Sequence, residues 1–151
     1  HAAEYQANRR DYQLRLQELH EYGLKCLAEI PLPQRTLVTS HDAFRYFGRA
    51  YGVQVEGVQG LSTESEAGLQ RLNGLVDQLV RQRLPAVFVE SSVSAKNMRA
   101  LMEGVRAKGH QISLGGELYA DSLGPVGSPA STYHGMMRHN FEIISAALGS
   151  R

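Results

Sequence analysis

The fold is indicated by a short stretch that follows two prolines and reads Thr36-Leu37-Val38-Thr39-Ser40-His41-Asp42. Its first four residues form a short apolar run, which is typical of a strand that is buried on both faces. A helix is expected to follow from Asp42 to Tyr51, with Gly52 as its C-cap. A buried strand that leads directly into a helix is the building unit of an α/β protein.

The same alternation continues along the chain. Three further strands are expected, over residues 53–58, 86–89 and 111–114. Thr63 and Glu66 form a capping box that begins one intervening helix, Ser94 can cap the next, and a last helix is expected from about Thr132 to Leu148. Strands separated by helices pair in parallel through right-handed crossovers. The sequence therefore predicts an α/β fold with a four-stranded, mainly parallel sheet and helices on both faces.

One long helix is expected before the prolines, from about Tyr5 to Ile30. Its apolar residues form a single narrow stripe, which consists of Tyr12, Leu16, Leu19, Gly23, Cys26 and Ile30. Pro31 and Pro33 end the helix. A narrow stripe on a long helix indicates a strut that lies against a domain, so the chain divides into a helix at 1–32 and an α/β unit at 33–151.

Composition excludes several classes of protein. The chain has 151 residues and a net charge of +1, and its acids and bases are mixed, so no basic surface for nucleic acid is indicated. A single cysteine excludes an internal disulfide, and no apolar run is long enough to cross a bilayer. The sequence contains no Gly-x-Gly-x-x-Gly, P-loop or Gly-x-Ser-x-Gly motif, so neither a nucleotide site nor a hydrolase is supported.

Open parallel sheets bind ligands at the carboxyl ends of their strands. The polar residues that follow the expected strands are Ser40-His41-Asp42, Gln59, Glu90-Ser91-Ser92, Glu117 and Asp121. One imidazole with several carboxylates suits a divalent cation of intermediate hardness such as Zn²⁺ or Mn²⁺. Carboxylates at strand ends also bind hydroxylated small molecules, so the pattern alone leaves both ligands open.

Each candidate also has a purely structural interpretation. Asp42 and His41 can serve the start of a helix, and Asp121 can serve a turn. Glu90 can accept hydrogen bonds from backbone amides or can support a ligand from outside the metal shell. Four other histidines that follow the first residue are expected at the surface or in structural hydrogen bonds. They are His20, His110, His134 and His139.

Four motifs resemble a known family over essentially the whole chain. They are Leu37-Val38-Thr39-Ser40-His41-Asp42-Ala43-Phe44 with its following helix, Val87-Phe88-Val89-Glu90-Ser91-Ser92, Gly115-Gly116-Glu117-Leu118-Tyr119-Ala120-Asp121-Ser122, and Thr132-Tyr133-His134-Gly135-Met136-Met137-Arg138-His139-Asn140. In order and spacing they resemble the C-terminal half of the periplasmic manganese/zinc solute-binding proteins of ABC importers.

The resemblance implies a two-lobed protein with a metal ion held between its lobes. Residues 1–32 would be the interlobe connecting helix and 33–151 the C-terminal lobe. His41 and Asp121 take the positions of the third and fourth metal ligands, and Glu90 matches a recurrent residue outside the ligand set. A backbone carbonyl or hydroxyl is expected to orient the second imidazole nitrogen. The other two ligands would be histidines of a missing N-terminal lobe.

The resemblance also implies a role in transport and not in catalysis. Zn²⁺ or Mn²⁺ would be the transported ligand without an organic cofactor, and the complete protein would deliver it to the membrane permease of an ABC transporter. The location would be periplasmic or extracellular, with membrane association through a missing N-terminal segment if that segment is lipidated. The isolated lobe would bind metal weakly and could self-associate. The alternatives are a small flavodoxin-like enzyme, a nucleotide-binding domain or a non-catalytic interaction module.

Overall fold

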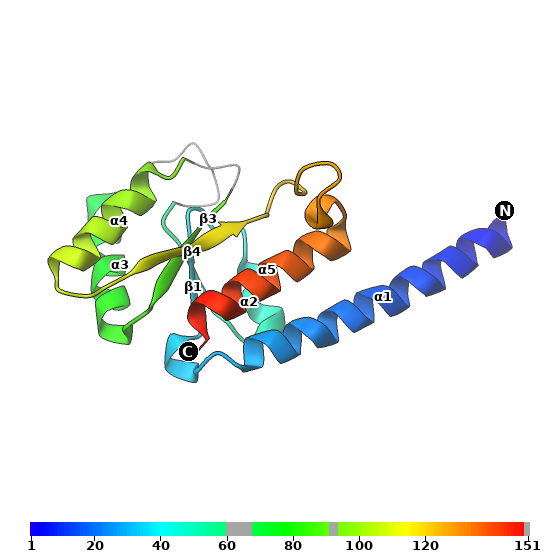
Figure 1. Ribbon diagram of the computed structural model, residues 1–151, viewed down its shortest axis with the longest axis horizontal. Coiled ribbons are helices and arrows are strands. Elements are labelled where there is room, and N and C mark those ends of the chain that lie inside the picture. The colour runs from blue at the N-terminus through cyan, green and yellow to red at the C-terminus, as the bar shows by residue number, and fades with distance from the viewer. Residues whose placement is uncertain (60–67, 91–93, 150–151) are drawn as a thin grey trace.

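The computed structural model describes residues 1–59, 68–90 and 94–149, and its elements alternate between helix and strand. In chain order they are α1 (Ala2–Ala28), the 3₁₀ turn η1 (Leu32–Gln34), β1 (Thr36–Thr39), α2 (Arg45–Tyr51), β2 (Gln54–Gly57), α3 (Leu69–Gln82), β3 (Ala86–Glu90), α4 (Lys96–Ala107), β4 (Ser113–Leu118), the 3₁₀ turn η2 (Pro129–Ser131) and α5 (Tyr133–Leu148) (Figure 1). The predicted α/β class is confirmed.

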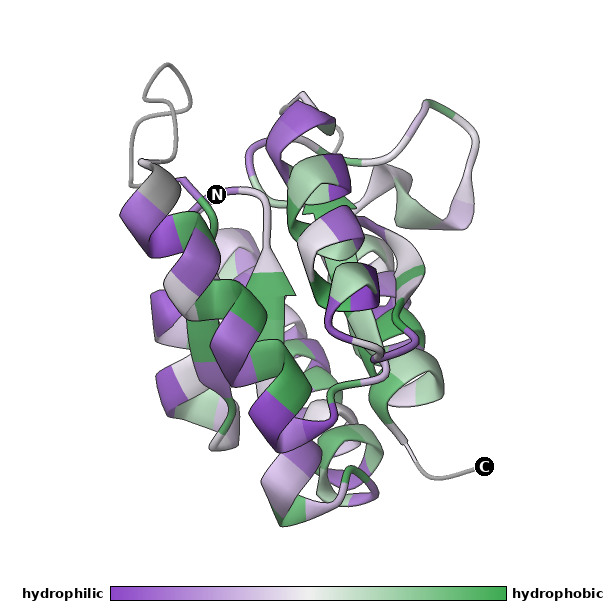
Figure 2. Ribbon diagram, turned by 90° about the vertical axis from the view of Figure 1, so that its left-hand side faces the viewer, coloured by the Kyte–Doolittle hydropathy of each residue, from purple (hydrophilic) through white to green (hydrophobic). Residues whose placement is uncertain are grey.

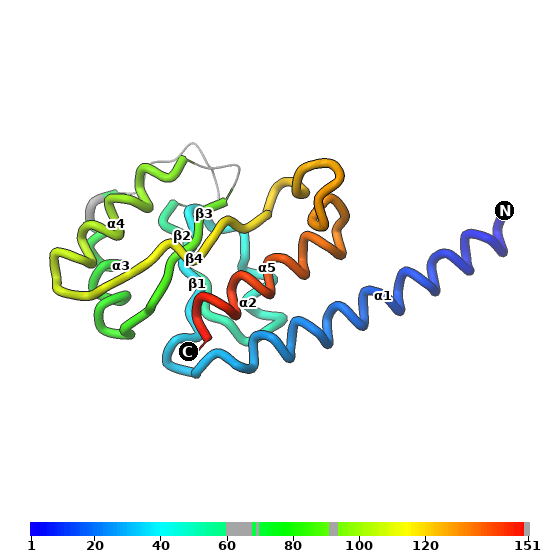
Figure 3. Tube along the Cα trace, viewed as in Figure 1, coloured from blue at the N-terminus to red at the C-terminus, as the bar shows by residue number. Residues whose placement is uncertain are grey.

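The strands pair in parallel, as predicted. β1 pairs with β2 and β3 pairs with β4, so the hydrogen-bonded ladders of the described residues form two pairs and not one continuous four-stranded sheet. β1 and β3 lie side by side between these pairs. Their carboxyl ends are joined through the side chain of Glu90, which binds backbone amides just after β1. All four strands therefore present their carboxyl ends in the same direction (Figure 3).

Helices cover both faces of the strand layer, as predicted, because successive strand residues point to opposite sides. Leu37 and Phe88 pack into a cluster with residues of α1, α2 and α5. Their neighbours Val38 and Val87 pack into a second cluster with residues of α3 and α4. Figure 2 shows hydrophobic colouring on the sides of the helices that face the strands. The two apolar clusters thus hold the strand ends in place.

α1 has two different halves. Residues 2–15 are exposed on every side, and Figure 1 shows this half extending beyond the rest of the molecule. Tyr12, which was expected on the buried stripe, is 49% exposed. The second half packs against α5, where Gly23 approaches Phe141 so closely that a Cβ would lie 2.5 Å from the ring. No helix in the described part of the chain is long and apolar enough to cross a membrane.

Several predicted boundaries differ from the structure. α2 begins at Arg45 and not at Asp42, whereas Gly52 caps its end in the left-handed conformation, as predicted. β4 covers Ser113–Leu118, later than the expected 111–114. The difference in β4 arises at a bulge, because Val87 pairs with Leu114 while Phe88 pairs with Gly116. The capping box of Thr63 and Glu66 lies outside the described residues.

Candidate metal centre

Three of the residues expected at strand ends meet at one edge of the strand layer. His41 follows β1 by two residues, Glu90 is the last residue of β3, and Asp121 follows β4 by three residues. Because the strands are parallel and β1 lies beside β3, their carboxyl ends are neighbours. His41 and Glu90 are only 3% and 2% exposed.

The carboxylate of Glu90 fixes the segment that carries His41. Its Oε2 accepts a hydrogen bond from the backbone N–H of Ser40 at 2.8 Å, and its Oε1 accepts one from the backbone N–H of His41 at 3.3 Å. Oε1 also lies 3.0 Å from His41 Nδ1. An ionised carboxylate can only accept, so Nδ1 donates to it. Glu90 therefore holds both the backbone and the ring of His41.

This arrangement agrees with the structural interpretation of Glu90, because the residue accepts from backbone amides, and the same carboxylate also contacts the imidazole. The expectation that a backbone carbonyl or hydroxyl orients the ring is wrong, because the contact comes from a carboxylate. The nearby hydroxyl of Thr39 instead donates to the backbone carbonyl of His41 at 2.8 Å. The contact could not be predicted from local sequence, because Glu90 lies 49 positions from His41.

The second ring nitrogen of His41 faces Asp121. The distance between His41 Nε2 and Asp121 Oδ2 is 3.2 Å, and the Asp121 side chain is 54% exposed. Two ligands of one tetrahedral Zn²⁺ lie roughly 3.3 Å apart when each metal bond is about 2.0–2.1 Å long. The separation of these two atoms is thus close to that of two donors sharing one cation. Among the described residues, no group of three or more His, Cys, Asp or Glu could hold a metal ion.

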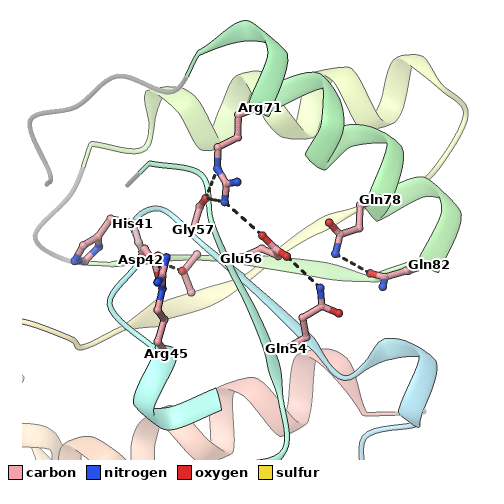
Figure 4. A network of polar contacts seen from close by, with 10 residues as sticks. His41, Asp42, Arg45, Gln54, Glu56, Gly57, Arg71, Gln78 and Gln82 are labelled. Carbon is pink, nitrogen blue, oxygen red and sulfur yellow. Dashed lines mark hydrogen bonds and ion pairs between the residues drawn. The ribbon is translucent and has the colours of Figure 1, made fainter. Parts of the chain in front are cut away.

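Asp42 is engaged elsewhere. It does not cap α2, whose N-cap is Phe44, and its Oδ2 accepts from Arg45 Nε at 2.6 Å. This hydrogen bond raises the pKa of the Arg45 guanidinium. Figure 4 shows Asp42 directed toward Arg45, and Arg71 directed toward the carbonyl of Gly57 and the carboxylate of Glu56. These groups line a cavity of about 330 Å³.

Three other histidines have structural partners. Nε2 of His110 lies 2.7 Å from the carbonyl of Leu84, and Nε2 of His139 lies 3.0 Å from the carbonyl of Glu117. Both agree with the expectation of structural hydrogen bonds. His20 is exposed, as expected, and its Nδ1 lies 3.2 Å from the hydroxyl of Tyr51.

The sequence did not single out Asn140, which is 1% exposed and binds the backbone of Tyr119 close to Asp121. The sequence does contain a pattern that could have pointed to Asn140. Asn140 lies four residues before Ile144 and eight before Leu148, so it occupies the apolar side of α5. A polar side chain on that side must find a partner inside the protein.

Known proteins resemble this chain over nearly its whole length. The family described as zinc-uptake complex component A, periplasmic, matches residues 1–147. The manganese-binding lipoprotein MntA of Bacillus subtilis is 48% identical over 148 residues, which cover 98% of this chain and 48% of that protein. The zinc-binding protein TroA of Treponema pallidum is 45% identical over 137 residues, which cover 91% of this chain and 44% of that protein.

The fold agrees with these matches. The solved structure of the periplasmic zinc-binding protein TroA from Treponema pallidum matches with a TM-score of 0.93 at 42% identity, covering 98% of this chain and 53% of that one. The chain spans about half the length of the relatives it matches. The resemblance inferred from the four motifs is confirmed, and the chain belongs to the zinc-uptake complex component A family.

Proposed function

We propose that this chain is the C-terminal lobe of a solute-binding protein and supplies two ligands, His41 and Asp121, to a transported Zn²⁺ or Mn²⁺. The observation that supports this most strongly is the 3.2 Å approach of His41 Nε2 to Asp121 Oδ2, on a ring whose Nδ1 faces Glu90 at 3.0 Å. In this proposal α1 belongs to a connecting helix at residues 1–32, and the lobe covers 33–151.

Glu90 supports the metal site without binding the metal. A histidine ligand commonly donates its second N–H to a carboxylate, which fixes the ring and raises the basicity of the free nitrogen. With Nδ1 committed to Glu90, the lone pair of Nε2 is directed toward Asp121. A cation bound there takes one nitrogen and one carboxylate oxygen from this chain.

The ligand types favour Zn²⁺ and Mn²⁺. Imidazole suits zinc, and carboxylate oxygen suits both zinc and the harder manganese ion. The names of the two relatives support the same pair of metals, because one is called manganese-binding and the other zinc-binding. Names that refer to metal binding also favour transport over a flavodoxin-like enzyme.

Two donors do not complete the coordination of either metal, so the remaining ligands would come from a preceding N-terminal lobe. The exposed first half of α1 is consistent with a connection to such a lobe, and its exposure would also permit self-association of this chain. The family description names a component of an uptake complex, which supports delivery of the cation to an ABC transporter permease outside the cytoplasm.

Calorimetric titration of this chain with Zn²⁺ tests the proposal. We expect weak binding that is lost in His41→Ala and reduced in Asp121→Ala. His20→Ala serves as the control, because it removes an imidazole whose partner is Tyr51 and which lies on α1. Equal binding by the unchanged chain and His41→Ala would contradict the assignment. A loss in His20→Ala would place the zinc on α1 instead.

A further inference from the structure

Asn140 makes a paired contact with the backbone next to the candidate metal centre. Its Oδ1 accepts from the N–H of Tyr119 at 3.1 Å, and its Nδ2 donates to the carbonyl of Tyr119 at 2.8 Å. The side-chain amide thus binds one residue as a neighbouring strand would. Asn140 is 1% exposed, so solvent does not replace these bonds.

Two glycines of β4 allow α5 to come this close. A Cβ on Gly115 would lie 2.6 Å from the Phe88 ring and 2.8 Å from the Cβ of Ala147. A Cβ on Gly116 would lie 2.8 Å from Ile143 Cγ2, and Gly116 has a φ of +146°. Because neither glycine has a side chain, α5 lies directly against the bulge of β4. The side chain of Asn140 then reaches Tyr119.

The chain around Tyr119 is therefore held from two sides. On one side, β4 pairs with β3 as far as Leu118, which lies opposite Glu90. On the other side, α5 provides Asn140, and His139 Nε2 lies 3.0 Å from the carbonyl of Glu117. The ring centroids of Tyr119 and His139 are 5.0 Å apart.

We propose that Asn140 is a positioning residue that sets the place of Asp121 relative to His41. This inference rests on the proposed metal site. Asp121 follows Tyr119 by two residues, a distance that the backbone spans in at most about 7 Å. Anchoring Tyr119 thus limits where the Asp121 carboxylate can lie. His41 depends on Glu90 and not on this contact, so the loss of Asn140 affects one ligand only.

A metal-free measurement tests the positioning directly. The ¹⁵N signals of the His41 ring would be recorded in the unchanged chain, Asp121→Asn and Asn140→Ala. We expect Asn140→Ala to shift the Nε2 signal in the same direction as Asp121→Asn, because both remove the carboxylate from its place, while Nδ1 keeps its contact with Glu90. An Nε2 signal that changes in Asp121→Asn but not in Asn140→Ala would overturn the proposal.

A Zn²⁺ titration separates positioning from a general structural role. Loss of an outer-shell contact typically weakens metal binding roughly 10- to 100-fold. We expect Asn140→Ala to cause a loss of about this size, and to cause none when it is combined with Asp121→Ala. A loss of equal size in both backgrounds would overturn the proposal, since Asn140 would then not act through Asp121.

Two further variants serve as controls for a general loss of stability. Ile144→Val removes buried volume from the same helix without touching Tyr119, and it should leave zinc affinity unchanged. If Asn140→Ala does not fold, His139→Ala removes the ring's contacts with the Glu117 carbonyl and with the Tyr119 ring, and it should weaken binding less, in the same direction. Unchanged binding in His139→Ala would then overturn the proposal. Failure of the metal site itself would look different, because His41→Ala would also bind zinc normally.

Discussion

The two proposed ligands lie in contrasting surroundings. His41 is 3% exposed, and a buried carboxylate holds both its backbone and its ring. The Asp121 side chain is 54% exposed and lies on a loop whose anchor is two residues away. The contrast indicates that one ligand is fixed by the core of the lobe, while the other depends on how a strand end is held. Substitutions on the two sides should therefore have different consequences.

Glu90→Gln should have the largest effect, because it disturbs the fixed side. An amide NH₂ would replace one of two oxygens that now accept from three N–H groups, and a buried donor left without an acceptor costs about 1–3 kcal/mol. Zinc affinity should also fall roughly 10- to 100-fold. Chemical denaturation and calorimetry measure the two effects. Glu117→Gln, at an exposed strand position, is the control, and equal stability of the two variants would contradict the assigned role of Glu90.

Gly116→Ala should disturb the other side through the helix that supports it. The added Cβ would meet Ile143, and the backbone conformation at φ +146° disfavours a side chain, so the free energy of unfolding should fall by about 1–3 kcal/mol. Gly74→Ala in α3 is the matched control. No atom lies within 4 Å of its added Cβ, and helix propensity predicts a gain of about 0.5–1 kcal/mol. Thermal unfolding should give opposite signs for the two variants, and a shared sign would refute the packing argument.

Asp121→Asn should separate binding from folding. Its side chain is half exposed, so the free energy of unfolding should change by less than about 0.5 kcal/mol. Zinc binding should weaken clearly, because an amide is a poorer ligand than a carboxylate for this cation. Calorimetry and urea denaturation on the same samples measure both. A variant that loses stability but keeps its zinc affinity would reverse the contrast between the two ligands.

Asp77→Asn should have the smallest effect, because this residue touches neither ligand. Its hydrogen bond with Lys108 lowers the pKa of Asp77. The ion pair therefore stabilises the fold above the pKa that Asp77 has in the unfolded chain, and this contribution is lost as the pH falls through the lower, folded value. The stability difference from the unchanged chain should be small at neutral pH and vanish in acid, with zinc affinity unaltered. A difference that grows in acid would contradict this sign.

Local sequence patterns predicted the fold well where an element depends mainly on the conformational preferences and burial of its own residues. The apolar run at 36–39 is β1 to the residue, and Gly52 is a C-cap because a left-handed position after a helix favours glycine. The start of α2 and the extent of β4 were misplaced for non-local reasons. Asp42 accepts a hydrogen bond from Arg45 and does not cap the helix. β4 continues past its two glycines because β3 pairs with it on one side and α5 packs against it on the other.

The site was predictable in part. The rule that ligands bind at strand ends selected His41, Glu90 and Asp121, and the structure brings these three residues together. The partner of the His41 ring was predicted incorrectly, because no local pattern reveals which side chain from another strand lies beside it. The contact of Asn140 with Tyr119 spans 21 positions and depends on the packing of α5 on two glycines, so only its unusual place on an apolar helix face pointed to it.

The proposed function requires that Nε2 of His41 binds the transported cation while Nδ1 remains bonded to Glu90. The most direct measurement is side-chain ¹⁵N NMR of all six histidines during titration with Zn²⁺. We expect zinc to shift the Nε2 signal of His41 into the range of a metal-bound nitrogen, with its Nδ1 still protonated. Zinc on Nδ1 of His41, or on another histidine with the His41 signals unchanged, would contradict the proposed role of His41.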